Sequence, residues 1–550
     1  MKRILLCSVF GPYGVDGELS RATNPMQLYK NQVTREQGAF SLEMFHRSWG
    51  IMMIQANINS PCVVLDFPDK ARFVKEICTQ VYDVIGISSI VCNIKKVEFM
   101  CEVIRQNQPW AKIVIGGHIS NVPDLEEQIN ADYIVKGDGI RWFRQFLGEN
   151  QDGAIKHPVI VSGLKPRSAG ISLTSDIAAT IIPSVGCPMG CNFCSTSAMF
   201  GGKGNWVDFY ETGDELFSVM EQVAETLKVC SFFVMDENFL LRRSRALRLL
   251  ELMEKNDKAW SIYDVFTSAK VLKSYSVDEL TRLGVSWVWI GLEGKDSGFS
   301  KLQGIDTFEL VKELQANGIR ALGSTIIGLE NHTPENIGEV IDYAVLHNTD
   351  FHQFMLYTPN PGTELYEEIT AKGLMKSPEE YEAADITGQT ILPYRHPHFN
   401  DQQTAEIMVR AFRRDFEVNG LSVVRIVETT LKGWLKYKNH PDLRVRRRFA
   451  WEARNLGIGL PVLVAATKLY YRDNPVMHEK MSKLLQKLHE EFGWKSRLIS
   501  SLGSHWLLGR IYKEEKRLAQ GCVNEPPTFY ERNLAAVDRP EVPWCPFVAV

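Results

Sequence analysis

The chain has 550 residues, of which 45% are hydrophobic and 23% charged, and its formal net charge is −4. These values are typical of a soluble globular protein with more than one domain. They exclude a broadly basic nucleic-acid-binding protein, so no nucleic acid is expected as a partner. No apolar run reaches the roughly 20 residues that a bilayer-spanning helix needs.

The amino-terminal residues combine a basic edge with a short apolar run over residues 4–10. A secretory signal needs a longer apolar segment and a small-residue cleavage site, so we interpret this run as a buried first strand. The cysteine count is eleven, an odd number in a large chain without an export signal. This favours metal-ligating thiolates over a disulfide framework and predicts a cytoplasmic protein.

Residues 1–150 alternate between strand and helix patterns. Gly116 and Gly117 follow one predicted strand directly, and Gly137 and Gly139 closely follow another. The pattern predicts a doubly wound α/β domain, which binds ligands at the carboxyl ends of its parallel strands. Apolar runs predict buried parallel strands at residues 4–9, 62–67, 84–88, 113–117 and 133–135, with helix-period segments between them, as at 70–81 and 95–106.

A second alternating series follows a connector without clear periodicity at residues 151–175. Six βα units over residues 176–385 predict a partial (β/α)6 barrel. Beyond it the strand signal ends, so residues 386–550 are predicted to form a mostly helical C-terminal domain. The barrel strands are expected at 180–185, 231–235, 263–268, 287–291, 323–328 and 354–357, with helices at 214–227, 244–254, 308–317 and 334–347.

Cys187, Cys191 and Cys194 form a C-x3-C-x2-C motif directly after the first predicted barrel strand. Three thiolates can ligate three irons of a [4Fe–4S] cubane and leave the fourth iron open. Gly186 and Gly190 permit the tight turns that a short wrapping loop needs. A structural zinc site is disfavoured because it usually takes four ligands in two separated pairs.

This motif and its position at the entrance of a partial barrel resemble the radical S-adenosylmethionine (SAM) superfamily. The resemblance implies that the open iron binds SAM, whose reductive cleavage gives a 5′-deoxyadenosyl radical that abstracts hydrogen from substrate. It also implies a redox partner such as ferredoxin or flavodoxin. Phe193 matches the family position that packs near the adenine.

Later segments match further family motifs in order. Asp236 and Glu237 end the second barrel strand, where the family binds the SAM amine, and a carboxylate there accepts hydrogen bonds from an ammonium. Glu293 stands in the fourth-strand motif as an expected ribose contact. Gly328 belongs to the fifth-strand glycine motif. An acid at a strand end is equally often a solvated helix cap.

A doubly wound domain ahead of such a barrel resembles the cobalamin-dependent class of the superfamily. The matching residues that the resemblance places around the corrin and its nucleotide tail are Ser88, Gly116, Gly117, Gly137 and Gly139. The D-x-H-x-x-G motif of many cobalamin proteins is absent, since the first loop, residues 10–17, contains no histidine. Cobalamin is then expected without a protein ligand on its lower face; loss of cobalamin is the alternative. His118 is interpreted as a loop histidine rather than a ligand.

The helical region carries a basic patch with interleaved aromatics. Such a patch could bind a membrane surface, an anionic lipid-like substrate or nucleic acid. The favoured interpretation is a solvated basic helix face without a ligand. The apolar segments at residues 456–467 and 506–508 keep peripheral membrane contact open. The patch comprises Lys432, Lys436, Lys438, Arg444, Arg446, Arg447 and Arg448, with Trp434, Tyr437 and Trp451.

The favoured activity is methyl transfer to an unactivated carbon of a small, apolar or lipid-like substrate. The resemblance implies that one SAM supplies the methyl group and another supplies the radical. The alternatives are a radical cyclisation, rearrangement or oxidation with cobalamin as electron carrier, and a non-catalytic cobalamin or redox sensor. The sequence offers no general acid or base, so the catalytic residues stay unassigned.

Overall fold

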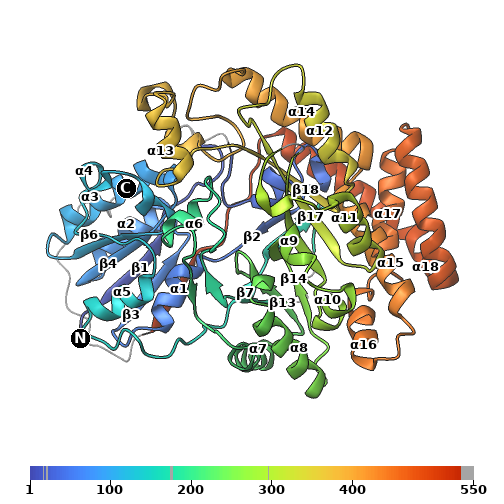
Figure 1. The fold of residues 1–550 in the computed structure, drawn as a ribbon, viewed down its shortest axis with the longest axis horizontal. Helices are drawn as coiled ribbons and strands as arrows, with labels where there is room; N and C mark the ends of the chain where they lie inside the picture. The colour runs from blue at the N-terminus through green and yellow to red at the C-terminus, as the bar shows by residue number, and fades with distance from the viewer. Residues whose placement is uncertain (17, 20–22, 174–177, 295–296, 534–550) are drawn as a thin grey trace.

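The computed structural model describes residues 1–16, 18–19, 23–173, 178–294 and 297–533 (Figure 1). Gly17 of the predicted first loop, residues 174–175 of the predicted connector and residues 176–177 of the predicted barrel domain lie outside these ranges, as do residues 534–550 of the predicted C-terminal domain.

The amino-terminal part is an open sheet covered by helices on both faces, as predicted (Figure 1). Alternate strand residues face opposite cores: Leu5 and Cys7 pack with α2 and α3, whereas Ile4 and Leu6 pack with α1 and α5. The parallel strands lie in the order β3-β1-β4-β5-β6, with the switch point between β1 and β4. The elements are β1 (Ile4–Ser8), α1 (Trp49–Ala56), β3 (Cys62–Asp66), α2 (Lys70–Thr79), β4 (Val84–Ser88), α3 (Ile94–Asn107), β5 (Lys112–Gly116), β6 (Tyr133–Ile134) and α5 (Gly139–Phe146).

A sixth strand of this sheet comes from the far end of the chain. β19 (Phe529–Asn533) pairs antiparallel with β3, from Phe529 opposite Asp66 to Asn533 opposite Cys62. The C-terminal region is therefore mostly helical, as expected, and contributes in addition one strand that the sequence did not predict. β19 alternates poorly in hydrophobicity because it is an edge strand with partly exposed side chains.

The second unit is the predicted partial barrel. Its parallel strands form two runs, β10-β13-β14 and β15-β16-β17-β18, which separate at Asp264, a residue with φ of +52°. The single strand predicted at 263–268 is therefore broken. The elements are β10 (Ala178–Ile181), α7 (Gly213–Leu227), β13 (Ser231–Val234), α8 (Arg243–Lys255), β14 (Ser261–Tyr263), β15 (Val265–Ser268), β16 (Trp287–Glu293), α11 (Thr307–Ala316), β17 (Arg320–Ile327), α12 (Ile337–Leu346) and β18 (Phe351–Leu356).

The connector contains short strands despite its lack of period. β7 (Val161–Ser162) extends the barrel sheet antiparallel to β10. β8 (Leu164–Ser168) and β9 (Ile171–Ser172) form a small sheet with β2 (Glu43–Phe45) from the first 50 residues. The connector thus ties the amino-terminal segment to the barrel.

Helices of the C-terminal region pack on the outside of the barrel (Figure 1). Gly433 in α15 approaches Gly318 so closely that a Cβ on Gly318 would lie 2.5 Å from the Gly433 Cα. Across the described ranges, no helix combines the length and apolar character needed to cross a membrane. The helices are α14 (Asp401–Asn419), α15 (Ser422–Tyr437), α16 (Leu443–Glu452), α17 (Gly459–Tyr470) and α18 (Pro475–Ala519).

Candidate active site

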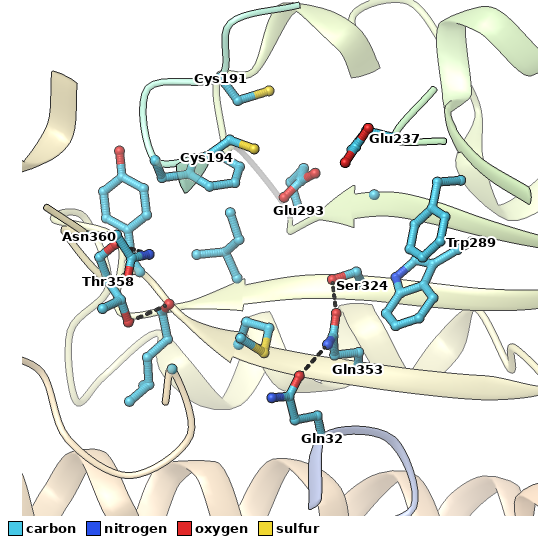
Figure 2. Close-up of a pocket in the computed structure, with 18 of the residues that line it drawn as sticks. Gln32, Cys191, Cys194, Glu237, Trp289, Glu293, Ser324, Gln353, Thr358 and Asn360 are labelled. Carbon is cyan, nitrogen blue, oxygen red and sulfur yellow. Dashed lines mark hydrogen bonds between the residues drawn. The ribbon is translucent and has the colours of Figure 1, made fainter. Parts of the chain in front are cut away.

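A cavity of about 500 Å³ opens at the carboxyl ends of the barrel strands. Cys187, Cys191 and Cys194 line it together with Glu237 and Glu293, so five of the predicted site residues face one space. In Figure 2 the labelled cysteines occupy one end of this cavity and Gln32 the other.

The cysteine loop connects β11 (Ser184–Val185) to the short helix α6 (Ser195–Met199). Its two glycines have φ of +85° at Gly186 and +62° at Gly190, and a Cβ at Gly190 would lie 2.5 Å from the Lys203 side chain. Cys194 caps α6, because its sulfur accepts a hydrogen bond from the Ser197 amide at 3.5 Å. The loop conformation therefore depends on glycines at both turns.

The chemistry of this donor set fits an iron–sulfur cluster. Burial, with the neighbouring thiols, raises the pKa of Cys187 to about 11, and burial also raises the pKa of Cys194. Thiolates at these positions therefore need positive charge close by, which iron supplies. No group of three metal-ligating side chains among the described residues is arranged for a single ion; a cubane places each thiolate on a different iron.

The two adjacent acids after β13 have different environments. Asp236 accepts hydrogen bonds from Arg245 at 2.6 Å and from Ser184 at 2.5 Å, so its charge is already compensated inside the protein. Glu237 lines the cavity, and its Oε2 is buried without a hydrogen-bond partner. Burial and the charge of Asp236 raise the pKa of Glu237 to about 8. Of the two predicted amine acceptors, the structure favours Glu237.

Glu293 lies at the end of β16, where a register shift interrupts the pairing with β17. It is 4% exposed and forms an ion pair with Lys301, a residue that the sequence interpretation missed. The Lys301 ammonium also lies 3.8 Å from the Cys191 sulfur. Burial opposes its charge, but Glu293 and the thiols outweigh burial and raise the pKa of Lys301.

Phe193 lies in the cavity wall, with its ring edge-on to Phe299 and Tyr357 at centroid distances of 5.5 and 6.0 Å. Gly328 does not line the cavity. Its amide bonds the ring of His332, and its carbonyl accepts a hydrogen bond from Tyr394 at 3.3 Å. Its φ of +81° explains the glycine as a backbone requirement. The wall of β17 is formed instead by residues earlier in the strand.

The floor of the cavity joins three polar side chains from distant segments (Figure 2). Ser324 donates to Gln353 at 2.9 Å, and Gln353 donates to Gln32 at 2.9 Å. Beside them, Phe266 and Trp289 stack with centroids 4.8 Å apart. The sequence interpretation missed these residues because Gln32 lies outside the barrel segment and inward-facing strand residues carry no motif.

A second cavity of about 220 Å³ lies between the amino-terminal sheet and the barrel. All five residues predicted around cobalamin line it, which are Ser88, Gly116, Gly117, Gly137 and Gly139. Gly117 has φ of +84°. A Cβ at Gly116 would have no neighbour closer than 4.0 Å, so that glycine leaves the cavity open.

No histidine is among the described residues that line this second cavity. His118 instead bonds the hydroxyl of Thr196 in α6 at 3.1 Å, and burial lowers its pKa. The C-terminal segment holds the loop after β1 in place. Glu525 accepts hydrogen bonds from the backbone amides of Tyr13 and Gly14, each at 2.9 Å.

Comparison with known proteins agrees with this geometry. Residues 181–344 match the model of the Radical SAM superfamily. The chain is 25% identical over 391 residues to an uncharacterized methyltransferase of Pyrococcus horikoshii, covering 63% of this chain and 81% of that protein. It is 26% identical over 309 residues to bacteriochlorophyllide d C-12(1)-methyltransferase of Chlorobaculum tepidum, covering 52% and 66%.

The fold is similar to that of the radical S-adenosylmethionine methyltransferase TsrM from Kitasatospora setae, solved with cobalamin and a [4Fe–4S] cluster bound. The TM-score is 0.53 at 16% identity, and the match covers 83% of this chain and 100% of that one. Residues 181–344 therefore form a radical SAM domain. In this chain the doubly wound α/β sheet precedes the radical SAM domain.

Proposed function

We propose that this enzyme is a cobalamin-dependent methyltransferase that methylates an unactivated carbon of a small molecule. The observation that carries the proposal is the position of Glu237, which lines both the cluster-side cavity and the cavity between sheet and barrel. The two spaces therefore adjoin, as two cofactors acting on one substrate require. The methyltransferases among the chain's relatives support the same reaction.

The cluster and SAM fit the first cavity. Cys187, Cys191 and Cys194 would hold the cluster, and the unpaired carboxylate of Glu237 suits the SAM ammonium. Glu293 is placed to receive ribose hydroxyls once its ion pair with Lys301 opens. The Phe193 ring offers an apolar face to the adenine.

Part of cobalamin would occupy the second cavity, whose backbone amides and glycines suit a phosphate-bearing tail; at about 220 Å³ the cavity is too small for the whole cofactor. Bound there, cobalamin would supply a methyl carrier, and the cluster with SAM would supply the radical. The chain's own residues bind and orient these groups. The apolar lining from Trp49, Phe143 and Met235 also keeps water from that space.

The substrate is proposed to be a compact, largely apolar molecule. SAM and substrate share a cavity of about 500 Å³, and sites for a single drug-sized ligand already span about 300–1,000 Å³. Lys301 is the only cation in the described lining, and it is paired with Glu293. The stacked Phe266 and Trp289 offer a flat apolar surface, and the Gln32 amide offers a donor.

The remaining parts of this proposal concern partners and location. A cluster that must be reduced needs a donor such as ferredoxin or flavodoxin, and a thiolate-ligated cluster suits the cytoplasm. The basic patch gives little support to lipid binding. Lys438 pairs with Glu491, Arg447 with Asp257, and Arg448 with Glu452.

The test is anaerobic reconstitution with iron, sulfide and hydroxocobalamin, followed by desalting and an absorption spectrum. Corrin bands beside the cluster absorption are expected, together with reductant-dependent cleavage of SAM. Incubation with methyl-labelled SAM and candidate aromatic substrates should then give labelled product. Cluster absorption without retained corrin would remove cobalamin from the proposal and favour radical rearrangement over methylation.

A further inference from the structure

The outer half of α18 has its polarity reversed with respect to an ordinary surface helix. A kink at Gly493, with φ of +74°, separates this half from the first. Its buried face begins with Ser496, Ser500 and Ser504, each at most 2% exposed, and continues with the apolar residues Leu507 and Ile511. Its exposed face carries a row of apolar side chains in steps of four residues, called here the outer stripe: Trp494 (68% exposed), Leu498 (52%), Leu502 (71%) and Trp506 (63%).

The reversal follows from how α18 packs on α17. Small side chains let the helices approach closely, and a Cβ at Gly503 would lie 2.9 Å from the Val462 side chain. Up to Ser504 the buried face therefore carries small residues, and the large side chains of Trp494, Leu498 and Leu502 lie on the exposed face. Surface helices normally show the opposite arrangement. In Figure 1 α18 stands at the right-hand edge of the molecule, where a flat partner can reach it.

The charges around the outer stripe have one sign. Between Gly493 and Lys513 the helix has four cationic residues and no acidic residue, and α17 contributes Lys468 and no acid. The nearest acids along the helix, Glu491 and Glu514, are paired with Lys438 and Arg517. The four cations, none of which forms an ion pair with another described residue, are Lys495, Arg497, Arg510 and Lys513.

We propose that the outer stripe docks this enzyme on an anionic lipid surface, with α18 lying in the plane of the interface. Tryptophans at both ends of an apolar row, flanked by lysine and arginine, have the chemistry that holds an amphipathic helix at the headgroup level. Large exposed apolar surface on a folded protein marks an interaction site. Pairing of two copies through the stripe would bring the same cations together, which disfavours a dimer.

The test is flotation of the reconstituted full chain with vesicles of phosphatidylcholine alone or mixed with phosphatidylglycerol. The wild type should partition onto the mixed vesicles and more weakly onto the neutral ones. Leu502→Glu should lower partitioning by about tenfold or more, because it removes one buried leucine and adds a repelled charge. The matched control is Leu346→Glu at the exposed end of α12, 67% exposed, which should partition like the wild type.

A second variant tests the charge. Lys495→Gln with Arg497→Gln should weaken binding to the mixed vesicles severalfold and leave binding to neutral vesicles unchanged. Circular dichroism and iron content must match the wild type in each variant. Absence of vesicle binding by the wild type, or equal losses in Leu502→Glu and Leu346→Glu, would overturn the proposal. A dimer in light scattering that only Leu502→Glu dissociates, without vesicle binding, would assign the stripe to a second copy instead.

Discussion

Asp236 and Glu237 are neighbours in sequence, yet their side chains have different environments at the end of β13. The Asp236 carboxylate points to Arg245, a side chain that is 1% exposed, and forms a buried ion pair. The Glu237 carboxylate faces the two cavities and has one oxygen without a partner. One acid therefore stabilises the barrel, and the other is available to a ligand.

Substitution of each acid should separate these tasks. Glu237→Gln is expected to weaken SAM binding about 10–100-fold, since a charge-assisted hydrogen bond contributes about 1.5–3 kcal/mol, and to leave the unfolding midpoint unchanged. Asp236→Asn should instead lower stability, by less than the roughly 3–5 kcal/mol that loss of a sole buried partner costs, because Arg245 keeps Asp208 at 3.5 Å. Calorimetric SAM titration and denaturant unfolding measure the two effects. A full loss of SAM affinity in a stable Asp236→Asn protein would reverse the assignment.

Lys301 is expected to influence how easily the cluster is reduced. Its ammonium contacts the Cys191 sulfur and the Glu293 carboxylate, so it is the positive charge beside the thiolates. Charge and hydrogen bonds to sulfur set cluster potentials. Lys301→Met should lower the midpoint potential, and Glu293→Gln should raise it by removing the opposing charge.

Both shifts are measured by a redox titration followed by electron paramagnetic resonance, without SAM. Each tenfold change in the reduction equilibrium corresponds to about 59 mV for one electron. Lys301→Arg is the control and should lie close to the wild type. Shifts of the same sign in Lys301→Met and Glu293→Gln would contradict this electrostatic role.

The sequence predicted only those site residues that belong to a local motif. The cysteine spacing and the acids at strand ends are local patterns, so Cys187, Glu237 and Glu293 were found and the structure places them in one cavity. Lys301 and Gln32 were missed because their contacts are made across the fold. Gly328 stays a predicted SAM contact from its motif; it is not among the described lining residues, and its carbonyl accepts a hydrogen bond from Tyr394.

At the scale of elements, strongly apolar or periodic segments were predictable and edge elements were not. β4 runs over Val84–Ser88, as its apolar sequence predicts, because both faces of this central strand are buried. β19 and the strands of the connector lack such runs, because an edge strand contributes only part of its surface to a core. These segments become strands because they pair with a neighbouring strand in the folded protein, and sequence periodicity does not reveal that pairing.

β19 and the segment before it are expected to stabilise the amino-terminal sheet. Glu525 bonds two amides of the loop after β1, and β19 covers the edge of β3. Truncation after Gly521 removes these contacts and should lower the unfolding midpoint and promote aggregation through the exposed edge. Glu525→Gln is a milder variant, expected to cost about 1 kcal/mol.

Hydrogen exchange reports the effect of truncation by element. Exchange should increase in β3 and in the loop after β1 while β16 and β17 keep their protection, because those barrel strands pair with other barrel strands, whereas β19 pairs with β3. Uniform loss of protection throughout the chain would mean that the segment stabilises the whole molecule instead. Unchanged protection of β3 would show that the edge strand contributes little.

At the scale of the whole molecule, the amino-terminal sheet and the barrel enclose one cavity between them, while the other opens at the barrel mouth and is also lined by Gln32, Ile90 and Cys92 from outside the barrel. The cavity between sheet and barrel is lined by Gly116 from the sheet and by Met235 from the barrel. The larger cavity is lined by the three cysteines. Ligand binding to the shared cavity therefore depends on both units, whereas the cluster depends on the barrel.

Blocking the shared cavity should separate the two cofactors. Gly116→Val is expected to fold, because a Cβ there has no neighbour closer than 4.0 Å, and to fill the space that a bound corrin would need. After reconstitution and desalting, the variant should retain iron and cleave SAM but lose corrin absorption and methyl transfer. The matched control is Gly459→Val in α17, where an added Cβ meets nothing within 4 Å. Corrin retained by Gly116→Val at the wild-type level would move the cobalamin site away from this cavity, whereas loss of iron as well would show that the two cavities do not function separately.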